Sequence, residues 1–110
     1  MTTLAQARTM ALSLPDTTEE PHHDLSSWRV KGKIFATVPD DDHIRVMLAE
    51  EEIRAAVSEH PGFCAEVYWG ARLAAVVVDL GAAPPEIVAE LLSDAWGRRA
   101  PRQRAPKTRG

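Results

Sequence analysis

The stretch WRVKGKIFATV, residues 28–38, decides the fold. Two short runs rich in aromatic and β-branched residues surround one glycine, and this pattern is typical of a β-hairpin. If its central Lys-Gly pair forms a two-residue turn, Trp28 lies opposite Phe35 on one face. Arg29 then lies opposite Ile34 on the other face. The stretch therefore predicts a hairpin and leaves open which of its two faces is buried.

The residues before this hairpin predict a helix and a loop. Apolar side chains recur at helical spacing, Thr3 can cap the first turn, and Pro15 stops the pattern. We therefore expect a helix over residues 3–14. Residues 15–24, PDTTEEPHHD, combine turn-forming residues with acids, so we expect a loop there.

The residues after the hairpin predict three more strands and two more helices. The expected strands are HIRVML (43–48), FCAEVYW (63–69) and RLAAVVVDL (72–80). One helix is expected to open at the acids of 50–52 and stop at Pro61, and the other to run from Pro84 to Gly97. The order α-β-β-β-α-β-β-α predicts an α+β domain, an antiparallel sheet of about five strands with helices packed on one face.

Size and composition fit one globular domain. The chain has 110 residues, of which 45% are hydrophobic and 26% charged. With Cys64 as the single cysteine, an intrachain disulfide and a cysteine zinc cluster are excluded. The longest apolar run is far shorter than the roughly 20 residues of a membrane span. We expect a cytoplasmic monomer that does not contact membranes.

The charge is unevenly distributed along the chain. The formal net charge is −3, but residues 98–110 carry six cations and no acid. The other 97 residues hold seven cations and all 16 acids. We therefore expect an acidic folded domain over residues 1–97 and a basic C-terminal tail over residues 98–110. An acidic body binds polyanions only if its few cations gather on one face.

Four stretches resemble the MmcQ/YjbR-like family. They are ALSLPDTTEE, WRVKGKIFATV, VYWGARLAAVVVDL and PPEIVAELLSDAWGRRAP. The resemblance covers about residues 3–101. It implies a frataxin-like (CyaY-like) α+β fold, and DNA binding through a double wing of hairpins has been proposed for such proteins. The resemblance supplies no catalytic residues. Frataxins bind iron through acids on their first helix, and the expected first helix here has none.

The sequence shows no arrangement typical of a metal site or a catalytic site. His22, His23 and Asp24 are adjacent, and adjacent side chains in extended chain diverge rather than converge on one ion. No nucleophile elbow, phosphate loop or dinucleotide fingerprint is present. We therefore expect a binding module rather than an enzyme, with no metal and no cofactor. A metal-dependent or acid–base enzyme is the third alternative, after the two kinds of binding described next.

Two kinds of binding remain open. Cations beside the hairpin tip and in the tail can contact phosphates, which predicts weak, salt-sensitive binding of DNA or RNA. The candidate residues are Arg29, Lys31, Lys33, Arg45, Arg98, Arg99, Arg102 and Arg104. The alternative is a protein- or small-ligand-binding module that uses a surface patch of His22, His23, Trp28 and Phe35. Tryptophans such as Trp28, Trp69 and Trp96 are nevertheless more typical of a core than of a stacking platform.

Overall fold

The structure is a computed structural model that describes residues 1–100 of the chain. Its helices are α1 (Leu4–Leu12), α2 (Glu50–Glu59) and α3 (Pro85–Arg99). Its strands are β1 (Thr17–His22), β2 (Leu25–Val30), β3 (Lys33–Asp40), β4 (His43–Val46), β5 (Cys64–Trp69) and β6 (Arg72–Asp79). No helix in this part of the chain is long and apolar enough to cross a membrane.

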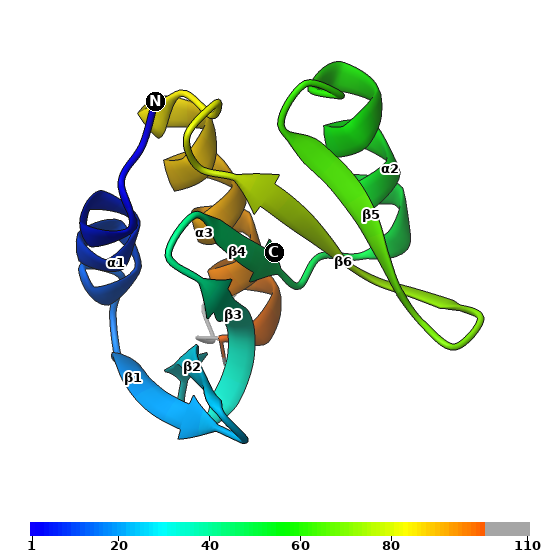
Figure 1. The fold of residues 1–110 in the computed structure, drawn as a ribbon. Coiled ribbons are helices and arrows are strands. Elements are labelled where there is room, and N and C mark those ends of the chain that lie inside the picture. The colour runs from blue at the N-terminus through cyan, green and yellow to red at the C-terminus, as the bar shows by residue number, and fades with distance from the viewer. Residues whose placement is uncertain (101–110) are drawn as a thin grey trace, which may run out of the picture.

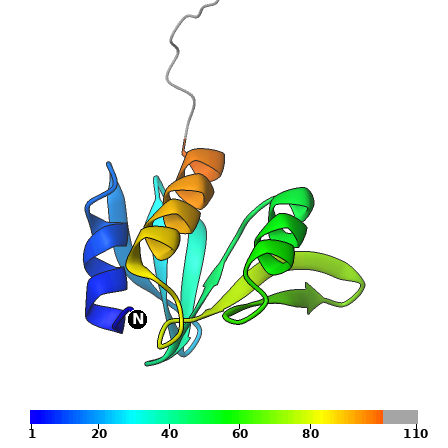
Figure 2. The same ribbon diagram turned by 90° about the horizontal axis from the view of Figure 1, so that it is seen from above.

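The six strands form one antiparallel sheet in the order β1-β2-β3-β4-β6-β5. The three helices lie along one face of the sheet (Figure 1, Figure 2). We call the other side, which no described helix covers, the open face. The predicted α+β fold with helices on one face is confirmed, and the sheet has six strands rather than about five.

The additional strand is β1, which we predicted to be part of a loop. Thr17–His22 pairs in regular register with β2, from Thr17 opposite Val30 to His22 opposite Leu25. The prediction was wrong because threonines favour strands and because an edge strand tolerates both acids and Pro21, which has no N–H to donate. A two-residue turn follows, in which His23 adopts a φ of 57°.

The β2–β3 pairing also differs from the predicted register at one position. Arg29 lies opposite Ile34 as predicted, but Trp28 lies opposite Ala36 rather than Phe35. The register shifts between Trp28 and Arg29, which leaves Phe35 as the extra residue of a β-bulge. Phe35 and Ala36 are both 0% exposed, so the bulge lets two successive residues of β3 enter the core.

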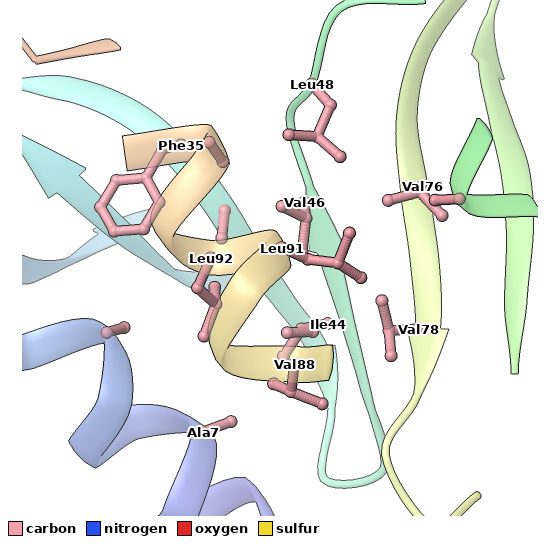
Figure 3. Packing of buried hydrophobic residues seen from close by; sticks show 14 of the residues in the cluster. Ala7, Phe35, Ile44, Val46, Leu48, Val76, Val78, Val88, Leu91 and Leu92 are labelled. Carbon is pink, nitrogen blue, oxygen red and sulfur yellow. The ribbon is translucent and has the colours of Figure 1, made fainter. Parts of the chain in front are cut away.

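The core lies between the sheet and α3. Figure 3 shows Val88 and Leu92 of α3 close to Ile44 of β4 and Phe35 of β3. Each of these four side chains is at most 1% exposed. Ala7 of α1 is also fully buried, and its small side chain allows α1 to pack closely beside α3. This packing sets the position of α3 on the sheet, and therefore which strand ends lie near the last turn of the helix.

The last helix is longer than predicted. Gly97 was expected to stop it, but α3 continues to Arg99, and the Ala100 N–H donates to the Trp96 carbonyl oxygen at 2.7 Å. A single glycine inside a helix costs only about 1 kcal/mol, which the packing of Trp96 against the core offsets. The predicted boundary after residue 97 is therefore wrong, because Arg98 and Arg99 belong to the last helical turn.

Candidate functional site

The β2–β3 turn presents two lysines to solvent. Lys31 has a φ of 51° and Gly32 a φ of 82°, and two successive positive values are those of a type I′ hairpin turn. The Lys31 Nζ lies 3.6 Å from Asp16 Oδ2, and both side chains are more than half exposed, so the pair is weak. Lys33 is exposed on the other side of the turn.

The last turn of α3 lies at the same end of the sheet as this hairpin turn. The Trp96 Nε1 donates to the Pro15 carbonyl oxygen at 2.8 Å, and the next residue, Asp16, is the partner of Lys31. Two arginines follow Trp96 within the same helical turn, where the helix dipole favours cations. We call this group the basic end, and its members are Lys31, Lys33, Arg98 and Arg99.

The guanidinium of Arg99, in the basic end, is partly buried. Burial lowers the pKa of Arg99, and the positive charges of Arg98 and Arg72 lower it further. Its Nε atom is buried and has no hydrogen-bond partner among the described residues. Arg72 is the first residue of β6. Because its charge acts on Arg99, the tip of the β5–β6 hairpin lies within electrostatic range of the basic end.

Two other predicted cations lie on the open face. The Arg29 guanidinium donates to the Ser27 Oγ and to the Pro21 carbonyl oxygen, each at 3.0 Å, and so is held across β1 and β2. Arg45 lies between two buried residues of β4 and therefore projects from the open face. The predicted cations of the described residues therefore form two groups, one at the basic end and one on the open face. The predicted residues Arg102 and Arg104 lie outside the described part of the chain.

The predicted ligand patch is not a surface feature. Trp28 and Phe35 are 0% exposed, because β2 and β3 are interior strands of the sheet and β3 packs against α3. His22 and His23 do lie at the surface, at the end of β1 and in the β1–β2 turn, with ring centroids 4.5 Å apart. The patch prediction is therefore wrong for its aromatic pair.

Glu19 anchors the buried Trp28. The Glu19 Oε1 accepts from the Trp28 Nε1 at 3.1 Å and from the Arg8 Nε at 2.8 Å. The hydrogen bond from Arg8 holds the pKa of the Glu19 carboxyl below its usual value, and the Trp28 bond acts in the same direction. The Glu19 carboxylate therefore links β1 to α1 and β2, and we assign it a structural role.

The sequence reasoning missed an exposed aromatic pair. Tyr68 and Trp69 are each 49% exposed at the tip of the β5–β6 hairpin. Trp69 was expected in the core because tryptophans are more typical of a core, whereas the core residue of this strand is Cys64. The adjacent turn residue Gly70 was the available signal, because side chains at a hairpin tip have few neighbours to cover them.

One cavity of the described residues has titratable side chains in its lining. A cavity of about 200 Å³ includes His43 in its lining, and the His43 Nδ1 lies 2.9 Å from Asp40 Oδ1, which raises the pKa of His43. Cys64 lines the same cavity, but burial raises the pKa of its thiol to about 11, so it stays protonated at neutral pH. Within residues 1–100, no group of three or more His, Cys, Asp and Glu side chains could hold a metal ion.

Comparisons with known proteins agree with this architecture. The family model described as YjbR matches residues 12–98. Among solved structures, the chain is similar to the crystal structure of the Deinococcus radiodurans protein DR2400, which has a DUF419 domain. The two chains are 24% identical with a TM-score of 0.73, and the match covers 87% of this chain and 77% of DR2400. At this identity the likeness shows a shared fold. No curated protein matches the chain.

Proposed function

We propose that this chain, which belongs to the YjbR family, is a binding protein. It contacts the phosphates of nucleic acid through its basic end. One observation carries the proposal: four cations from segments far apart in the sequence share one end of an otherwise acidic domain. They come from the β2–β3 turn and from the last turn of α3.

The distribution of charge along β3 supports this proposal. The strand begins at Lys33 in the basic end and finishes at Asp40, which starts a run of three aspartates. Along this strand, a polyanion is therefore attracted to the Lys33 end and repelled from the Asp40 end. Such a gradient orients a charged ligand during its approach, even when the net charge of the protein is negative.

The state of Arg99 supplies a second argument. Its guanidinium is partly buried, lacks a hydrogen-bond partner at Nε among the described residues, and is repelled by two neighbouring arginines. A phosphate group beside the guanidinium would offset this repulsion, and arginine forms strong charge-assisted bonds to phosphate oxygens. On this account the domain binds its ligand by electrostatic contact and performs no catalytic step.

A binding titration at two salt concentrations tests the proposal. The full chain is added to a fluorescently labelled oligonucleotide, and the affinity is compared with that of Lys31→Gln/Lys33→Gln and Arg98→Gln/Arg99→Gln. Each lost phosphate contact should weaken binding severalfold at low salt and reduce the slope of log affinity against log salt by about 1. We expect both double variants to bind more weakly than the natural chain.

Two matched controls separate the basic end from the rest of the molecule. Arg54→Gln removes a cation that lies 3.5 Å from Glu50 on α2, and it should leave binding nearly unchanged. Arg102→Gln/Arg104→Gln removes two cations of the tail in the full chain. If only the tail variant loses affinity, the basic end has no role. If the natural chain fails to bind at low salt, the proposed function is wrong.

A further inference from the structure

The tip of the β5–β6 hairpin combines an exposed aromatic ring with an arginine. Figure 1 shows this hairpin projecting beyond the body of the domain. Trp69 is 49% exposed and lies directly opposite Arg72 across the turn. Paired residues of antiparallel strands point to the same side of a sheet, so the indole and the guanidinium share one face of the hairpin.

That shared face is the open face of the sheet. The neighbouring pair, Tyr68 and Leu73, must point to the opposite side, and Leu73 is 4% exposed in the core beneath the helices. Trp69 and Arg72 therefore lie on the same side as Arg45 of β4, whose neighbours in the strand are both buried. An aromatic platform and two cations thus occupy one uncovered surface.

The acids near the hairpin lie on its other side. The Tyr68 hydroxyl donates to Glu66 Oε1 at 3.1 Å, and this bond raises the pKa of Tyr68. Charges of Arg54 and Glu50 on α2 also reach Tyr68, which agrees with a side chain that faces the helices. Within residues 1–100, Glu66 and Glu50 therefore lie on the side of Tyr68, opposite the side that carries Trp69.

We propose that the nucleic acid bound by this protein is single-stranded, and that an unstacked base stacks on Trp69 while Arg72 contacts an adjoining phosphate and Arg45, which pairs with Val77 further along β6, contacts a phosphate further along the chain of nucleotides. The inference rests on the proposed function, because it extends the path of the bound nucleic acid from the basic end, past Arg99 and Arg72, onto the open face. An exposed indole can accept the face of any base, but a duplex hides those faces within its own stack. Arginine beside an aromatic ring suits the same ligand, since it binds phosphate and also stacks.

The test compares single strands and duplexes of the same sequence, both fluorescently labelled, against the full chain. We expect tighter binding of the single strand. Trp69→Ala should weaken that binding by roughly 5-fold or more, the lower range for loss of one stacked base. Tyr68→Ala is the matched control, because Tyr68 is equally exposed at the same tip but faces the helices. Trp69→Phe keeps an aromatic platform and should restore most of the affinity.

Each outcome distinguishes the two proposals. Equal binding of duplex and single strand, with Trp69→Ala unchanged, overturns the single-strand inference and leaves the proposed function in place. Equal losses in Trp69→Ala and Tyr68→Ala overturn the assignment of Trp69 to a separate face. Failure of the natural chain to bind either ligand removes both proposals. If Trp69→Ala instead dissociates an oligomer of the natural chain in sedimentation, the exposed indole serves self-association and the inference is wrong.

Discussion

The β2–β3 and β5–β6 hairpins place their aromatic residues in opposite environments. In the β2–β3 hairpin, Trp28 and Phe35 are 0% exposed, whereas Tyr68 and Trp69 of the β5–β6 hairpin are 49% exposed. The first hairpin lies between β1 and β4, and its β3 strand packs against α3, but β5 is an edge strand. The position of a hairpin in the sheet, rather than its own sequence, therefore decides whether its aromatic rings stabilise the core or remain available to a ligand.

The largest expected contrast is in stability. Trp28→Ala removes a fully buried ring and should lower the free energy of unfolding by about 3–5 kcal/mol. Trp69→Ala should cost less than about 1 kcal/mol, because substitutions at exposed positions usually have small effects. Urea unfolding of the two variants measures both values. Equal losses would show that Trp69 is part of the core and would break the comparison.

The second contrast concerns Glu19, which supports only the β2–β3 side. Glu19→Gln should cost about 1–2 kcal/mol at pH 7, because it weakens the charge-assisted bonds to Arg8 and Trp28. The pKa of Glu19 is lowered from its usual 4.5, so this stabilisation is present above about pH 4.5 and is lost as the pH falls through the folded-state value.

Urea unfolding as a function of pH checks the Glu19 prediction. The natural chain and Glu19→Gln should converge in stability at low pH, while Glu20→Gln, at an exposed neighbouring position, should match the natural chain at every pH. A difference between the natural chain and Glu19→Gln that stays constant down to the lowest pH would contradict the role given to this carboxylate.

The third prediction concerns what the two hairpins share. Gly32 and Gly70 have φ values of 82° and 65°, and an added Cβ would meet nothing within 4 Å at either position. Gly32→Ala and Gly70→Ala should each cost about 1 kcal/mol, purely from the positive φ. Gly62→Ala, equally open but without a positive φ, should change the unfolding midpoint very little. A much larger loss at one turn would show that more than the positive φ requires glycine there.

The smallest expected effect on stability is at Lys31. Its exposed pair with Asp16 should contribute less than about 0.5 kcal/mol, so Lys31→Gln should leave the urea midpoint nearly unchanged. The same substitution should weaken oligonucleotide binding severalfold. A variant that loses stability but not affinity would show that this lysine is structural.

Local signals in the sequence predicted most of the fold. The Thr3 cap is confirmed, since the Gln6 N–H donates to the Thr3 Oγ1 at 3.1 Å, and so is the Lys31-Gly32 turn. Strand β1 was missed because its two threonines are a weak strand signal among acids and turn-forming residues, and its pairing with β2 is a tertiary feature. The bulge at Phe35 was missed because no residue type in the hairpin indicates a bulge.

The candidate site was less predictable than the fold. Lys31 and Lys33 were identified from the hairpin itself, but their proximity to the last turn of α3 depends on how that helix packs. Trp69 alternates with apolar residues as a core residue would, and its exposure follows from the edge position of β5. Such placements are set by tertiary packing, which one strand's periodicity does not contain.

The most direct test of the account is a titration of the ¹⁵N-labelled full chain with a single-stranded oligonucleotide, followed through the indole N–H resonances in NMR. Trp28 and Trp69 each give one such signal, and they report on the buried and the exposed hairpin in the same sample. We predict that the Trp69 signal shifts as the ligand saturates, while the Trp28 signal stays in place. A bound state in which the Trp69 signal does not move would contradict the central claim.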